Sequence, residues 1–92
     1  MIQSFKCKDP QALFEGASPR GFKDLARVAE RKLAQLDAAQ TLSFLKAPLG
    51  NHLEALRDDR KGQHSIRIND RSRICFTWTE AGPANVEIVL YR

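Results

Sequence analysis

The strongest constraint on the fold is the alternation of apolar and polar residues through the last third of the chain. Segments 64–69, 73–78 and 86–92 each place every second side chain on one side of an extended backbone. A period of two is typical of strands, so we expect three of them here, with one side facing a core. The side expected to face the core carries Ile66, Ile68, Ile74, Phe76, Trp78, Val86, Ile88 and Leu90.

The connections between these segments predict a meander. A further short strand is expected at 52–57, joined to 64–69 by DDRKG, where Gly62 can supply the turn. Asn69 and Asp70 tolerate the positive φ that a tight hairpin needs, so 69–72 is predicted to be such a turn. The segment TEAGPAN predicts a looser connection before the last strand.

The first half of the chain has the period of helices. Residues 1–7 are expected to form a strand, and Asp-Pro at 9–10 suits the N-cap and first position of a short helix closed by Gly16. Ser-Pro at 18–19 repeats the signal before a longer helix that runs to about residue 39, and Thr41 is expected to cap one more turn. The longer helix has one apolar stripe: Phe22, Leu25, Ala26, Ala29, Leu33 and Leu36.

With 92 residues the chain has room for a single core, and its 42% apolar content suffices to fill it. We therefore expect one α+β domain over residues 1–92, with an antiparallel sheet and two or three helices packed on one face. Cys7 and Cys75 match no metal-ligand spacing and are expected to be small core or sheet residues in a reducing compartment. The opening MIQSFKCK is too short and too charged for an export signal, and no stretch approaches a membrane span. These features favour a cytoplasmic protein with no membrane partner, no metal and no cofactor.

The basic residues change character along the chain, which has a net charge of +4. From Ala47 onward six of the seven basic residues are arginine, whereas lysine leads five to three before that point. Arginine offers a planar fork of donors that matches a phosphate, so this change indicates either phosphate binding or ordinary solvated charge. The side of the sheet opposite the core is expected to be open to a partner; it carries Ser65, Arg67, Arg73, Cys75, Thr77 and Tyr91.

One long arrangement resembles a known family. LEALRDDRKGQHSIRINDRSRICFTW followed by VEIVLYR resembles the HigB branch of the RelE-like toxins, the toxin halves of bacterial toxin–antitoxin pairs, also called plasmid-maintenance killer proteins. MIQSFKCKDPQALFEG and AERKLAQLDAA are similar to the opening and the long helix of these toxins. The resemblance implies the RelE-like, microbial-RNase-type fold and a metal-independent endonuclease that cuts messenger RNA in the ribosomal A site and arrests translation. It also implies a HigA-like helix-turn-helix antitoxin. The toxin would contact operator DNA only indirectly, through this antitoxin.

RNA cleavage without a metal requires particular groups. A base must take the proton of the 2′-hydroxyl, cations must hold the charge that builds on the phosphoryl oxygens, and an acid must protonate the leaving 5′-oxygen. The candidate catalytic residues are Glu54, Arg57, Arg73, Tyr91 and Arg92, and the candidate RNA-binding residues are Arg60, Lys61 and Arg67.

Each assignment has an alternative. Glu54 is either the general base or a solvated partner of a neighbouring arginine, and Arg60 and Lys61 either bind RNA or make their turn soluble. His52 is expected to be a surface residue and His64 a packed or edge residue that shares the parity of the core. Trp78 is expected to pack in the core.

The chain departs from the family pattern at the residues that would carry proton transfer. HigB-like toxins usually end in Asp-Tyr-His, where this chain has Leu90, Tyr91 and Arg92, and the family's usual histidine and lysine match Glu54 and Arg57. Arginine stays protonated at neutral pH and cannot shuttle a proton as histidine does. Leu90 is expected to join the edge of the core, which would leave Tyr91 projecting to the open face.

Two functions therefore stay open: a cleaving toxin, or a binding module with the toxin fold that engages antitoxin and ribosome without efficient cleavage. A basic DNA-binding domain ranks third, because no recognition helix follows the long helix.

Overall fold

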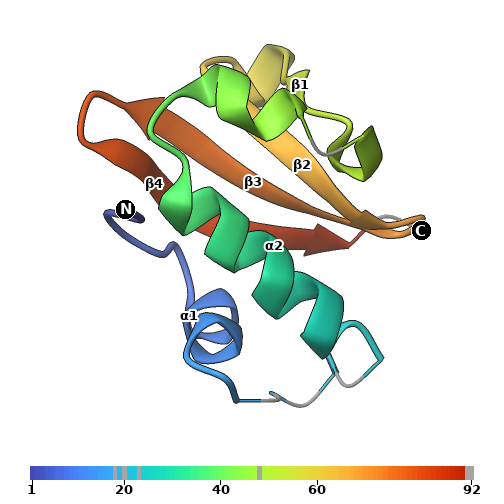
Figure 1. Ribbon diagram of the computed structural model, residues 1–92. Helices are drawn as coiled ribbons and strands as arrows, with labels where there is room; N and C mark the ends of the chain where they lie inside the picture. The colour runs from blue at the N-terminus through green and yellow to red at the C-terminus, as the bar shows by residue number, and fades with distance from the viewer. Residues whose placement is uncertain (18, 20, 23, 48, 91–92) are drawn as a thin grey trace.

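The computed structural model describes residues 1–90 except 18, 20, 23 and 48, and shows an antiparallel sheet with helices on one face (Figure 1). The four strands are neighbours in chain order: β1 (Glu54–Ala55), β2 (Gln63–Asn69), β3 (Ser72–Thr79) and β4 (Gly82–Leu90). The helices are α1 (Lys8–Phe14) and α2 (Ala26–Ala38), with short 3-10 helices η1 (Leu42–Lys46), η2 (Leu49–Asn51) and η3 (Asp58–Arg60). The predicted α+β meander is confirmed.

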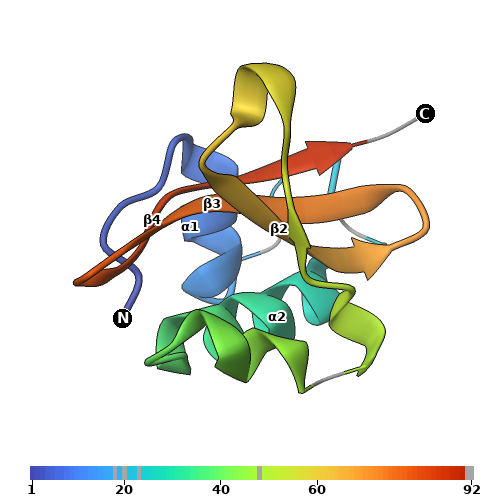
Figure 2. The same ribbon diagram turned by 90° about the horizontal axis from the view of Figure 1, so that it is seen from above.

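The core lies between the sheet and α2. Ile66, Ile74, Phe76 and Val86 are fully buried from the sheet side, and they pack in one cluster with apolar residues of α2 such as Leu33. Figure 2 shows α2 on one side of the sheet, whereas the connection between β1 and β2 rises on the other side. Alternation along the strands therefore predicted the buried face correctly, and Trp78 and Ile88 pack against its margin as expected.

Leu90 is the exception to this pattern. Its side chain is 56% exposed, although it shares the parity of Val86 and Ile88. Leu90 lies at the end of β4, where it lines a hollow together with Gly21, Asp24 and Leu25 of the segment before α2. The expectation that Leu90 joins the edge of the core was wrong.

The face opposite the helices is less open than the parity predicted. Ser65 and Cys75 lie opposite one another on β2 and β3, and both are fully buried. Both side chains are short and longer side chains lie beside them. Glu87, which forms an ion pair, lies opposite Cys75 on β4, and Arg73 donates a hydrogen bond to Ser65. Arg67, Arg73 and Thr77 on this face are half-buried, so part of each side chain is available to a partner.

The predicted strand at 1–7 does not form as a regular strand. Its backbone follows β4 through hydrogen bonds from Gln3 N to Pro83 O (2.7 Å) and from Lys6 N to Val86 O (2.9 Å), with one parallel bridge between Phe5 and Val86. Asn85 has a positive φ of 53°, which interrupts the regular edge of β4. The N-terminal segment consequently pairs with β4 only in short stretches.

Both helices differ from the prediction at their first turn. Cys7, not Asp9, is the N-cap of α1. Asp9 lies in the first turn, where its negative charge interacts favourably with the positive end of the helix dipole. Gly21 has a φ of 91°, which a right-handed helix cannot accommodate. Gly21, Asp24 and Leu25 lie in turns, and α2 begins at Ala26. The Ser18 part of the second cap signal lies outside the described residues.

Other predicted helix ends are confirmed. Gly16 follows α1 with φ of 92°, and the Thr41 hydroxyl caps η1 by accepting a hydrogen bond from Phe44 N (3.3 Å).

Both hairpin turns form by side-chain hydrogen bonds. Neither Asn69 nor Asp70 has the predicted positive φ; instead Asn69 Oδ1 accepts from Arg71 N (2.9 Å) and Ser72 Oγ (2.6 Å). The connection predicted as loose at 79–85 is a tight turn, because Thr79 Oγ1 accepts from the backbone N of both Ala81 and Gly82 (3.2 Å each) and β4 begins at Gly82.

The two cysteines are free thiols in different surroundings. Cys75 is buried in the sheet, as predicted, whereas Cys7 is exposed at the start of α1, so it is not a core residue. In the part of the chain that the structure describes, no helix has the length and apolar character needed to cross a membrane.

Candidate active site

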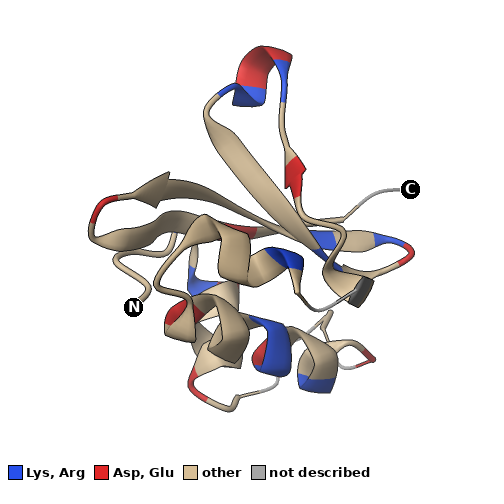
Figure 3. Ribbon diagram, turned by 45° about the horizontal axis from the view of Figure 1, so that its top comes forward, with Lys and Arg blue, Asp and Glu red and all other residues tan. Residues whose placement is uncertain are grey.

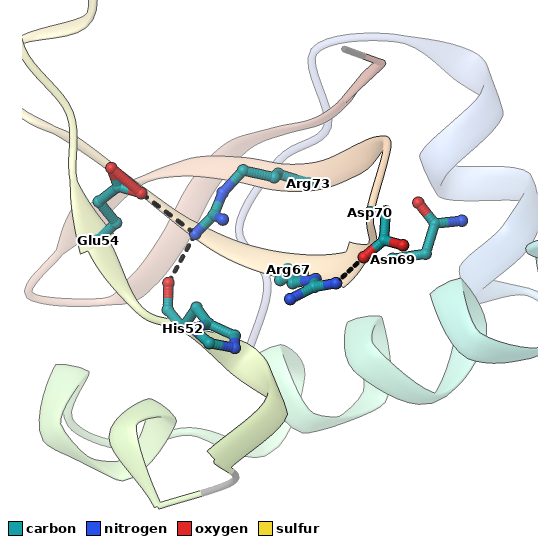
Figure 4. Close-up of a pocket in the computed structure, with 6 residues that line it drawn as sticks. All are labelled: His52, Glu54, Arg67, Asn69, Asp70 and Arg73. Atoms are coloured by element: carbon teal, nitrogen blue, oxygen red, sulfur yellow. Dashed lines mark hydrogen bonds and ion pairs between the residues drawn. The ribbon is translucent and has the colours of Figure 1, made fainter. Parts of the chain in front are cut away.

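A pocket opens on the sheet face opposite the helices, where β1, β2 and β3 come together. It is lined by residues from these strands and their flanking turns (Figure 4): His52, Glu54, Arg67, Asn69, Asp70 and Arg73. The register explains the convergence: Arg67 lies directly opposite Arg73, and Glu54 lies opposite Ser65, two residues before Arg67. Three of the predicted site residues, Glu54, Arg67 and Arg73, are therefore brought together.

Arg73 is held in place from three directions. Its Nε donates to Ser65 Oγ at 2.7 Å and its Nη2 donates to the backbone oxygen of His52 at 2.6 Å. The same Nη2 lies 3.6 Å from Glu54 Oε2, and the Arg73 side chain is only 16% exposed. A guanidinium fixed in this way loses little conformational entropy when it binds an anion, which is a property expected of a preorganised phosphate ligand.

Arg67 and Arg73 form a like-charged pair across neighbouring strands, an arrangement that destabilises a sheet by itself. Each guanidinium has a carboxylate partner: Arg67 pairs with Asp70 across the turn, and Arg73 pairs with Glu54. Asp70 is 88% exposed, so this carboxylate contributes little to stability and can be displaced by another anion. Two adjacent guanidinium groups and an exchangeable carboxylate make the pocket suited to a phosphodiester.

Glu54 fits both interpretations made from the sequence. Its carboxylate is 60% exposed and is the ion-pair partner of Arg73. It also lies at the edge of the pocket, where it could reach a bound ligand (Figure 4).

The predicted RNA-binding residue Arg60 lies in a different cluster on the same face. Its Nη1 contacts Glu87 Oε2 at 3.0 Å and Gln63 Oε1 at 3.1 Å, and Lys6 Nζ lies 3.3 Å from the same Glu87 oxygen. Arg60 is thus not among the residues that line the pocket.

Arg57 and Lys61 belong to the segment that projects between β1 and β2, and both are exposed. Figure 3 shows that the tip of this segment carries both signs of charge. Neither residue is among those that line the pocket; both lie on a neighbouring protrusion. The remaining two predicted catalytic residues, Tyr91 and Arg92, lie outside the described residues.

Three residues of the pocket lining were not predicted as site residues: His52, Asn69 and Asp70. His52 was assigned to the surface because a single histidine before a strand is usually a surface residue. It is exposed, as expected, but it lines the pocket beside both arginines. Strand alternation could not have predicted this position, because His52 has a φ of 46° and lies before β1, where the backbone is not extended. His64 has the predicted packed position, with its ring 6.3 Å from that of Phe76 on the helix side and a buried Nδ1.

The buried thiol beneath this face is not a nucleophile. Burial raises the pKa of the Cys75 thiol, and the Glu87 carboxylate opposite it acts in the same direction, so Cys75 stays protonated at neutral pH. Among the described residues, no group of three or more histidine, cysteine or carboxylate side chains could hold a metal ion.

The fold and the pocket together define a small α+β domain with an arginine-lined pocket on the sheet face opposite the helices. Residues 4–90 match the HigB-like toxin family, described as the RelE-like toxin of type II toxin–antitoxin system HigB. The chain therefore belongs to this family, which confirms the resemblance seen in its sequence.

Two relatives share part of this sequence. Over 55 residues the chain is 46% identical to Toxin HigB-1 of Vibrio cholerae serotype O1, a match that covers 60% of this chain and 58% of that protein. Over a stretch of the same length it is 33% identical to an uncharacterized protein of Haemophilus influenzae, covering 60% of this chain and 54% of that protein. The match thus spans a little over half the length of either relative.

Proposed function

We propose that this chain is the toxin of a type II toxin–antitoxin pair and that it cleaves messenger RNA in the ribosomal A site, without a metal. The observation that carries the proposal is the pocket in which Arg67 and Arg73 lie side by side on the open sheet face. The fixed guanidinium of Arg73 and the neighbouring guanidinium of Arg67 can bind a phosphodiester and stabilise the negative charge that develops on it during cleavage.

Dependence on the ribosome follows from the exposure of the site. His52, Glu54 and Asp70 are all exposed, so the pocket is open to water on one side. A flexible RNA strand must be aligned for attack by its own 2′-hydroxyl, and alignment of this kind accounts for much of the rate in such reactions. The ribosome supplies an ordered message, so the toxin needs to supply only the groups that bind the phosphate and transfer protons.

The expected partners follow from this role. They are the ribosome and its message in the cytoplasm, and a HigA-like helix-turn-helix antitoxin that binds the toxin and connects it to operator DNA. The antitoxin would neutralise the toxin by occupying it; no direct contact between the toxin and DNA is proposed.

The test is expression of the chain without antitoxin, with cut sites in a translated message mapped by primer extension. We expect cleavage within translated regions and little cleavage of the same RNA without ribosomes. Arg73→Ala should abolish the cuts, whereas Arg31→Ala, which makes the same charge change on an exposed position of α2, should retain them.

Two other outcomes would contradict the proposal. Efficient digestion of naked RNA would show that the ribosome is not required. Binding to ribosomes without any cut would instead establish the alternative function, a non-cleaving module with the toxin fold. The departures from the family pattern at Leu90 and Arg92 are the feature that favours this alternative.

A further inference from the structure

His52 has a backbone conformation that side chains seldom adopt. Its φ is 46°, and it is one of three non-glycine residues with positive φ in the described part of the chain. Such a conformation costs free energy unless the surroundings impose it, and it is concentrated at functional sites. Contacts on both sides of His52 hold it in this conformation.

The residue before His52 is anchored to α2. Asn51 is fully buried, and its Nδ2 donates to Leu45 O (3.2 Å) and to Gln35 Oε1 (3.3 Å), while its Oδ1 accepts from Lys32 Nζ. A buried amide satisfied at both ends cannot rotate without losing hydrogen bonds. The chain thus enters position 52 from a fixed point.

On the other side, the backbone oxygen of His52 is held by the guanidinium of Arg73 at 2.6 Å. Asn51 and Arg73 together determine the orientation of the peptide groups around His52. As a result the imidazole lies on the pocket wall beside Arg67 and Arg73 (Figure 4). The ring and the Arg73 guanidinium thus line the same pocket.

We propose that His52 is the general base of the cleavage reaction, an assignment that rests on the proposed function. The imidazole takes the proton of the 2′-hydroxyl, the 2′-oxygen forms a bond to phosphorus, and the bond from phosphorus to the 5′-oxygen breaks. The products are a 2′,3′-cyclic phosphate and a 5′-hydroxyl. Water supplies the proton that the 5′-oxygen takes up, and the imidazolium returns its proton to water.

The chain contains only two histidines, which makes the assignment testable by pH. His64 packs against Phe76 on the helix side of the sheet and cannot reach the pocket. The charged groups that face His52 are Glu54 and Asp70, with Arg67 and Arg73 as the cations. Glu54 is the competing base, and a carboxylate ordinarily titrates about two pH units below an imidazole.

The experiment measures single-turnover cleavage of a message in the A site of a stalled ribosome complex, from about pH 5.5 to 8.5. It compares the wild-type chain with His52→Asn, His52→Gly and His64→Phe. Asparagine and glycine both tolerate positive φ, so the two substitutions at position 52 preserve the backbone and remove only the imidazole. His64→Phe removes the other imidazole and retains an aromatic ring against Phe76.

We expect both variants at position 52 to cleave roughly 100-fold more slowly or worse. They should also lose the fall in rate that we expect of the wild type as the pH drops from about 7 to 5.5, because a protonated imidazole cannot accept the 2′-hydroxyl proton. His64→Phe should keep that fall, and ribosome binding should be unchanged in all variants.

A His52→Asn variant that retains the wild-type rate and pH profile would overturn the assignment and leave Glu54 as the base, with the proposed function intact. A wild-type chain that never cleaves would refute the proposed function and, with it, this assignment.

Discussion

Arg73→Ala tests the site most directly, because the structure allows its effects on stability and on activity to be separated. The substitution removes the hydrogen bonds to Ser65 Oγ and His52 O and the ion pair with Glu54. His52 and Glu54 are exposed and can be rehydrated, so the main cost comes from the bond to buried Ser65. A hydrogen bond of a charged donor contributes about 2 kcal/mol.

A loss of about 2 kcal/mol lowers the melting temperature of a domain of this size by roughly 10 °C. Such a loss does not unfold a domain of ordinary stability at 25 °C, since the free energy of unfolding of such domains is about 5 kcal/mol or more. Loss of a preorganised cation at the phosphoryl group typically reduces the rate by about 100-fold or more. Cleavage at 25 °C should therefore fall far more than the folded fraction does.

The assay combines thermal melting followed by circular dichroism with cleavage of a translated message at 25 °C. Arg71→Ala is the matched control: it makes the same charge change at an exposed position of the β2–β3 turn that does not line the pocket. Arg73→Lys keeps the charge but not the fork of donors, so we expect an intermediate rate. A variant Arg73→Ala that melts about 10 °C lower yet cleaves normally would show that the residue is structural, and the reasoning would fail.

The other predictions concern the exchangeable carboxylate and the C-terminal residues. Asp70→Asn should tighten binding to ribosomes, measured by co-sedimentation at low salt, because it releases Arg67 and removes a negative charge; weaker binding would mean that the pair orders the site. Its melting temperature should hardly change, since Asp70 is 88% exposed. The double change Leu90→Asp and Arg92→His should increase cleavage and toxicity by restoring a proton-transfer pair. Because Leu90 is exposed, the change should not impair folding. Equal activity of the two chains would show that this pair is dispensable. Tyr91→Ala should reduce both cleavage and toxicity, and unchanged growth arrest would exclude a role for the ring.

The sheet was largely predictable from the sequence, because the pattern that indicates a strand lies within each short segment. Alternation along 64–69, 73–78 and 86–90 determines which side chains can be buried together, whatever the partner is. The same parity placed Arg67 and Arg73 on one face, and the structure confirms that they lie opposite one another. The family resemblance in the second half of the chain was confirmed as well.

The edges of these elements were not predictable, because they depend on neighbours distant in sequence. Leu90 lines a hollow with residues of the segment before α2, and residues 1–7 pair irregularly with β4, where Asn85 has a positive φ. Burial of Cys75 depends on side chains from other strands on its face. Local pattern could indicate the parity of each residue but not what covers it.

The pocket shows the same division. The arginine pair is a property of one hairpin, whereas the position of His52 depends on Asn51 and its contacts with α2, 16 to 19 residues earlier in the chain. Arg73 reaches the backbone of His52 across 21 residues, and Arg60 is directed to Glu87 across 27. The sequence by itself determined which residue types were available on the open face. Only tertiary packing decided which of them meet, because the hydrogen-bond partners belong to segments distant in sequence that the core holds together.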